Sequence, residues 1–99
     1  MYTNKARFIK ERKDMSSVLD QLKENYIFAV IRGKSSDDAI EISKHSVLGG
    51  IKNIEVTYTT PEASKAITEL KALYAKKSEV VIGAGTIMTV ELAKEAIAA

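Results

Sequence analysis

Three polar side chains lie in or just after apolar segments, and together they could bind a small organic acid and transfer protons to or from it. Arg32 and Thr86 each come just after such a segment, and Glu55 lies inside another. A guanidinium binds a carboxylate through paired hydrogen bonds, a carboxyl group transfers protons, and a hydroxyl both donates and accepts. Glu55 is the most informative of the three, because a carboxylate among Ile and Val is costly unless something pairs with it.

Each of these residues also has a structural interpretation. Arg32 can extend from a strand end into water, and Thr86 can satisfy backbone groups in a turn. Glu55 is harder to explain in this way, since a carboxyl group with an unusual environment is often functional. Small residues such as Gly85 let a backbone approach an anion closely. The candidate site therefore consists of Arg32, Glu55, Thr57, Gly85 and Thr86.

The elements that position these residues are three predicted strands, which begin about 25 residues apart, the length of a repeating βα unit. Short, β-branched and continuous, these segments resemble strands covered on both faces. Their bounds are 26–31, 51–57 and 80–84. Helical patterns lie between and after them, and another precedes the first strand. In a parallel sheet the carboxyl ends of all strands meet at one edge, where ligands bind.

Strand periodicity places Glu55 and Thr57 on one face of the sheet, opposite Ile54 and Val56. If the apolar face meets helices, Glu55 points into the interior of a barrel. We expect the helix after this strand to begin at Thr60-Pro61-Glu62, with Thr60 as its cap and the proline at its first position.

Two α/β architectures fit this pattern, an open three-layer sandwich and part of a (βα)8 barrel. Three parallel strands alone would leave exposed sheet edges, and residues 97–99 stop inside a helical pattern. We therefore expect a truncated chain of the TIM-barrel class. Residues 1–15 would form a basic leader, and residues 16–99 would supply an N-terminal helix and about three βα units.

Composition excludes several classes of function. The chain has 99 residues, 45% hydrophobic and 28% charged, as in one soluble domain or a piece of a larger one. No apolar run approaches the ~20 residues of a membrane span, and no signal peptide opens the sequence. The lack of cysteine excludes thiolate chemistry and agrees with a cytoplasmic location.

Nucleic-acid, nucleotide and metal binding are not predicted. The leader 1–15 is basic but has no arginine cluster with interleaved aromatic readers. The segment 83–88 has two glycines of the dinucleotide fingerprint, but Met88 stands at the position of the third. His45 is interpreted as a surface or interface residue, and no residues have metal-ligand spacing. We expect no cofactor.

The ordered motifs resemble those of the KDPG/KHG aldolases, the 2-keto-3-deoxy-6-phosphogluconate and 4-hydroxy-2-oxoglutarate aldolases. The resemblance covers roughly residues 16–99, the N-terminal half of such a protein. It depends on the order and spacing of four segments: FAVIRG (28–33), GGI (49–51), IEVT (54–57) and GAGT (83–86).

The resemblance implies a class I aldolase on a (βα)8 barrel, a homotrimer without a metal. It cleaves a 2-keto-3-deoxy sugar acid, often phosphorylated, into pyruvate and an aldehyde through a Schiff base on a lysine. Glu55 corresponds to the family's general acid and base, and Thr86 to a threonine that holds the substrate carboxylate.

The sequence departs from the family pattern in two places. Many members have an arginine shortly after the E-V-T motif, where this chain has Tyr58, Thr59 and Thr60. Arg32 resembles the substitute found in phosphogalactonate-type aldolases. The Schiff-base lysine belongs to the half that this chain lacks, and Lys34 lies in a loop, so we expect residues 1–99 to be inactive alone.

Two other functions stay open at this point. One is another (βα)8 enzyme that acts on a phosphorylated metabolite, such as an isomerase or epimerase. The other is a non-enzymatic three-layer α/β module for binding or assembly.

Overall fold

The computed structural model describes residues 18–99, so the predicted leader 1–15 lies outside the described part of the chain. A helix over residues 18–25 comes first. Strands and helices then alternate, in agreement with the predicted α/β class and its three βα units. The elements are β1 (Phe28–Ile31), α2 (Ser36–Leu48), β2 (Asn53–Thr57), α3 (Ala63–Leu73), β3 (Val81–Gly85) and α4 (Val90–Ala98).

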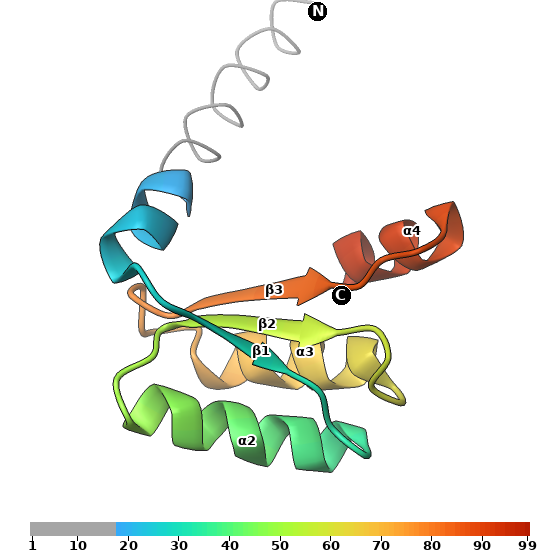
Figure 1. Ribbon diagram of the computed structural model, residues 1–99, viewed down its shortest axis with the longest axis horizontal. Helices are drawn as coiled ribbons and strands as arrows, with labels where there is room; N and C mark the ends of the chain where they lie inside the picture. Colours follow the sequence, from blue (N-terminus) through green and yellow to red (C-terminus); the bar gives the residue numbers. More distant parts are fainter. Residues whose placement is uncertain (1–17) are drawn as a thin grey trace, which may run out of the picture.

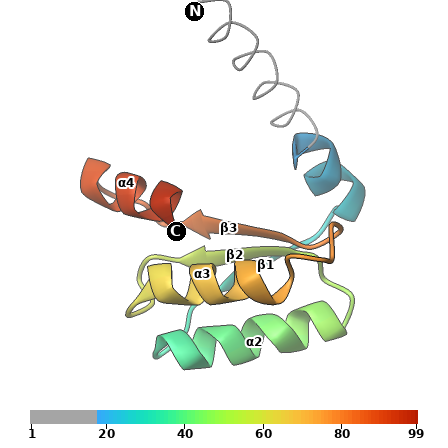
Figure 2. The ribbon, with the colours of Figure 1, turned by 180° about the vertical axis from the view of Figure 1, so that it is seen from behind.

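The three strands form one parallel sheet in the order β1-β2-β3. Glu55 in the central strand is paired with Val30 of β1 and Gly83 of β3. Figures 1 and 2 show α2 and α3 together on one face of this sheet. The parallel sheet is therefore confirmed, while closure of such a sheet into a barrel stays a prediction.

The core lies between the sheet and these two helices. Ile54 and Val56 point to the helical side and are 2% and 0% exposed, and Leu70 of α3 is 0% exposed. Burial of each such side chain contributes about 1.5–3 kcal/mol relative to leaving it in water. The other buried apolar residues are Ile31, Ala39, Ala63, Ala66 and Ile67.

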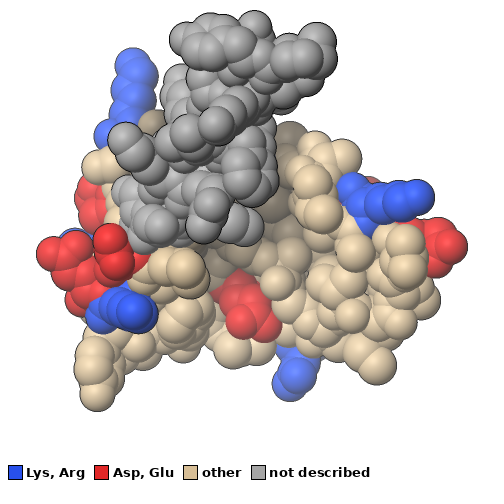
Figure 3. All heavy atoms as spheres, turned by 90° about the horizontal axis from the view of Figure 1, so that it is seen from above, with Lys and Arg blue, Asp and Glu red and all other residues tan. Residues whose placement is uncertain are grey.

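The opposite face of the sheet is open in residues 18–99, contrary to the expectation of strands covered on both faces. Phe28 and Val30 of β1 are 48% and 54% exposed. In the view of Figure 3, acidic atoms appear in the middle of a largely uncharged surface. Continuous apolar runs do not distinguish a strand covered by helices from one whose second face is left for other segments to cover.

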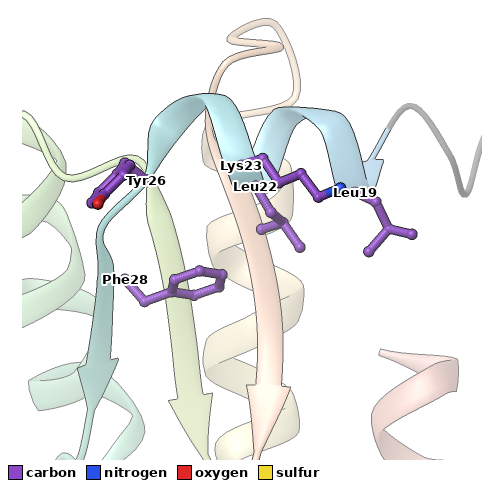
Figure 4. A pocket seen from close by; sticks show the side chains of 5 residues that line it. All are labelled: Leu19, Leu22, Lys23, Tyr26 and Phe28. Carbon is purple, nitrogen blue, oxygen red and sulfur yellow. The ribbon is translucent and has the colours of Figure 1, made fainter.

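The helix over residues 18–25 covers only the amino-terminal end of the open face. Leu22 lines a hollow there with Phe28, and Figure 4 shows Leu22 projecting from the helix and Phe28 from β1, while Tyr26 points away from them. Asn53 is fully buried and donates from Nδ2 to the Leu22 carbonyl at 3.0 Å. Asn25 donates to the Asn53 side chain at 2.9 Å. No helix within residues 18–99 has the length and hydropathy needed to cross a bilayer.

One predicted helix start is wrong. Thr60 does not cap α3, which begins at Ala63, and the preceding Glu62 has left-handed backbone angles with no side-chain cap. The reason is that the Thr60 hydroxyl accepts a hydrogen bond from the Gly33 amide at 3.0 Å instead. Pro61 therefore belongs to the turn before the helix rather than to its first position.

Candidate active site

The carboxyl edge of the sheet carries the predicted site residues. Arg32 follows β1, Thr57 ends β2, Gly85 ends β3 and Thr86 follows it. Because the three strands are parallel and adjacent, these strand ends lie along one edge. Glu55 lies two residues before the end of the central strand, so the topology brings all five residues to one region of the molecule.

Glu55 is partly buried and belongs to the open face, because its neighbours Ile54 and Val56 occupy the core. Its side chain passes over Gly85. A Cβ at that glycine would lie 2.6 Å from Cδ and 2.9 Å from Cγ of Glu55. The carboxyl group is thus turned toward the carboxyl edge of the sheet.

The surroundings of Glu55 explain how the strand tolerates an acid. Among residues 18–99 no side chain forms an ion pair with it. It borders a hollow on the open face with apolar neighbours, including Phe28 and Val81. Since this face is not closed, the carboxyl group keeps access to water and avoids the full cost of burying a charge. Its apolar neighbours in the sequence favour a buried acid, whereas the structure shows a half-buried one.

Thr57 is fully buried, and its hydroxyl is already used within the protein. Oγ1 of Thr57 donates to the Ile31 carbonyl at 3.1 Å and lies 2.8 Å from Oγ1 of Thr59. The bond to the Ile31 carbonyl joins the end of β2 to the end of β1. The proposed contact of Thr57 with substrate stays a prediction, but the structure gives this side chain another role, in holding two strand ends together.

Arg32 has a fixed backbone and an exposed side chain. The carbonyl of the preceding Ile31 accepts from Thr57, and the amide of the following Gly33 donates to Thr60 at 3.0 Å. Thr60 itself is only 3% exposed. The guanidinium makes no hydrogen bond or ion pair with any of residues 18–99. An exposed guanidinium at this edge that has no partner within residues 18–99 is suited to bind an anionic ligand.

Thr86 has an uncommon backbone conformation. Its φ is +56°, in the left-handed region, and its side chain is exposed. For a β-branched residue this conformation costs on the order of 1–3 kcal/mol, and such positions cluster at functional sites. The Tyr58 amide donates to the Gly85 carbonyl at 2.9 Å, which fixes the backbone just before Thr86.

A chain of hydrogen bonds supports the edge from the helical side. The Tyr58 hydroxyl lies 2.6 Å from Oγ of Ser64, which donates to Oε2 of Glu95 at 2.6 Å. These three residues connect the segment after β2, helix α3 and helix α4. Sequence reasoning missed them, as it missed the bond from Gly33 to Thr60. The only signal was a cluster of hydroxyl residues at 57–60.

In the part of the chain that the structure describes, no three His, Asp or Glu side chains come together as a metal site. His45 is exposed in the last turn of α2, as predicted for a surface residue.

Comparison with known proteins gives a consistent family. A family model described as KDPG and KHG aldolase matches residues 18–99. The chain is also similar to the 2-dehydro-3-deoxy-phosphogluconate aldolase of Treponema pallidum (strain Nichols), with 33% identity over 85 residues. This alignment covers 86% of the chain and 39% of that relative, so the chain spans about two fifths of the relative's length.

The hydroxyl of Thr57 can be tested as a link between strands. Thr57→Val keeps nearly the same volume but leaves the Ile31 carbonyl without its partner. We expect the free energy of unfolding of the intact protein to fall by about 1–3 kcal/mol, measured by denaturant unfolding. Thr68→Val, at an exposed position of α3, is the control, with an expected change within about 0.5 kcal/mol. Equal changes for the two variants would contradict this role.

Proposed function

The chain belongs to the KDPG and KHG aldolase family, and on this premise we propose that the intact protein is a class I aldolase. Its substrate would be a 2-keto-3-deoxy sugar acid, phosphorylated or not, or 4-hydroxy-2-oxoglutarate, cleaved to pyruvate and an aldehyde. The observation that carries the proposal is the Glu55 carboxyl group on the open face, turned toward the edge where Arg32 and Thr86 follow neighbouring strands. We further propose that the intact protein assembles as a homotrimer.

In the proposed chemistry, this chain supplies the group that transfers protons, and a lysine outside residues 1–99 supplies the amine. The lysine amine forms a protonated imine with the substrate ketone and withdraws electrons from the carbon–carbon bond that breaks. Glu55 accepts a proton as that bond breaks and returns one to the pyruvate carbon, directly or through a water molecule. The half-buried position of Glu55 supports this role, because its side chain lies over Gly85 while the carboxyl group keeps access to water.

Arg32 and Thr86 would hold the substrate carboxylate. The two bonds that flank Arg32, from Thr57 and to Thr60, fix its backbone while its guanidinium stays exposed. A guanidinium and a hydroxyl together can bind both oxygens of a carboxylate. Thr57 would support Arg32 through its bond to the Ile31 carbonyl, and Gly85 precedes Thr86 directly; both would also contact the substrate.

Replacement of the acid is the first test of the mechanism. Glu55→Gln keeps the size and polarity of the side chain but cannot transfer a proton. In the intact protein we expect kcat for aldol cleavage to fall by about 10²-fold or more, with a smaller change in KM. The measurement is steady-state release of pyruvate. A kcat near that of the parent protein would overturn the role of Glu55.

The carboxylate contact predicts an effect on binding. Arg32→Ala removes a charge-assisted bond of about 1.5–3 kcal/mol, so KM for the keto acid should rise by about 10- to 100-fold. Lys34→Ala is the matched control, because Lys34 is an exposed cation two residues away whose side chain is not assigned to the site. A similar rise of KM in both variants would indicate a general effect of charge and contradict a specific contact.

Trapping with borohydride distinguishes the aldolase from an isomerase or epimerase on a similar fold. We expect the intact protein incubated with pyruvate and borohydride to gain the mass of one reduced pyruvate adduct on a lysine, detected by mass spectrometry. Incubation without pyruvate is the control. An unmodified protein would favour the isomerase or epimerase and overturn the Schiff-base mechanism.

A further inference from the structure

The two glycines of the segment Gly83-Ala84-Gly85 differ in what surrounds them. Both lie in β3, at alternate positions, and therefore on the same face of the sheet as Glu55. A Cβ at Gly83 would meet no heavy atom within 4 Å. A Cβ at Gly85 would overlap the Glu55 carboxyl group, at 2.6 Å from its Cδ.

Backbone conformation does not account for glycine at position 85. Within residues 18–99, the only glycine with a positive φ is Gly50, at +105°. Gly85 pairs regularly with Thr57 in the parallel ladder, so an alanine there would be compatible with the strand. The constraint is one of space: the three atoms nearest to a Cβ at this position all belong to the Glu55 side chain, so any side chain at position 85 would force Glu55 to move.

The strand register explains why this contact directs the Glu55 side chain toward the carboxyl edge of the sheet. Glu55 pairs with Gly83, and Gly85 lies two positions farther along β3. The Glu55 side chain therefore runs diagonally over the neighbouring strand, toward the carboxyl edge, to reach the space above Gly85. The next residue is Thr86, which begins the connection to α4.

We propose that Gly85 is a positioning residue, whose lack of a side chain lets the Glu55 carboxyl group lie toward the ligand-binding edge of the sheet. This inference rests on the proposed acid–base role of Glu55, and it gives Gly85 a function other than contact with substrate. A methyl group at position 85 would displace the carboxyl group and turn it back over the middle of the sheet. Gly83 is not required in this way.

The test compares Gly85→Ala with the matched control Gly83→Ala in the intact protein. A direct readout is the ¹³C resonance of the Glu55 carboxyl group. We expect this resonance to move in Gly85→Ala and to stay as in the parent protein in Gly83→Ala. This measurement needs no catalysis, so it tests the position of the carboxyl group even if the proposed function is wrong.

Kinetics provide the second readout. We expect Gly85→Ala to lower kcat by about 10- to 100-fold, the scale of a displaced catalytic group. Gly83→Ala should stay within about twofold of the parent. In the Glu55→Gln background, Gly85→Ala should lower kcat much less than it does in the parent, because both changes act through the same group.

If Gly85→Ala folds poorly, denaturant unfolding provides a third readout. The denaturant midpoint should fall in Gly85→Ala and recover in the double variant Glu55→Ala/Gly85→Ala, where no carboxyl group competes for the space.

Three results would overturn the inference: an unchanged Glu55 resonance in Gly85→Ala, equal effects of the two glycine variants, or a full additional loss of kcat in the Glu55→Gln background. Failure of the proposed function is distinguishable, because it would appear as normal kcat in Glu55→Gln while the resonance still moved in Gly85→Ala.

Discussion

The alternation of side chains along β2 is the constraint on which the site depends. Ile54 and Val56 are buried against the helical layer, with 2% and 0% exposure. Because successive side chains of a strand point to opposite faces, Glu55 between them must lie on the other face. A slip of one residue in the pairing would bury the carboxyl group among Leu and Ala side chains and expose two large apolar groups instead. The hydrophobic core therefore fixes the position of the candidate catalytic acid.

Hydroxyl groups at the end of β2 form hydrogen bonds that fix the segments at the carboxyl edge of the sheet. Thr57 bonds to the Ile31 carbonyl, and Thr60 accepts from the Gly33 amide. Arg32 lies between these two bonds, so its backbone is tied to the central strand on both sides. On the helical side, Ser64 bridges Tyr58 and Glu95 and thereby ties α4 to the same segment. The segments that carry the exposed candidate groups are thus held by polar contacts between neighbouring elements.

The open face of the sheet is the feature that bears on the proposed barrel. Phe28 and Val30 stay about half exposed while the helical side is tightly packed. One-sided cover is compatible with the proposed barrel, because in a barrel the helices line only the outside and the strands face one another within. The chain spans about two fifths of the length of its curated relative. In the proposed enzyme, further strands would cover this face and bring the Schiff-base lysine toward Glu55.

Much of this protein could be predicted from the sequence because the relevant patterns are local. Strand and helix periodicity predicted the order of the elements and the face on which Glu55 lies. The ordered motifs predicted the family, which the match over residues 18–99 confirms. The caps at Ser35 and Thr89 also follow local rules, and both accept a hydrogen bond from an amide three residues later, at 3.1 Å.

Only the tertiary structure decided how individual polar groups are used. Thr60 has every local feature of a helix cap, yet its hydroxyl is taken by Gly33, 27 residues away. The hydroxyl of Thr57 goes to a carbonyl 26 residues away, and Ser64 finds Glu95 at a distance of 31 residues. The sequence predicts only that Gly85 lets the backbone approach an anion, and the structure shows that the Glu55 carboxyl group lies above it. Sequence periodicity specifies which face a side chain occupies, but its partner depends on the register of neighbouring strands, which exists only once the chain has folded.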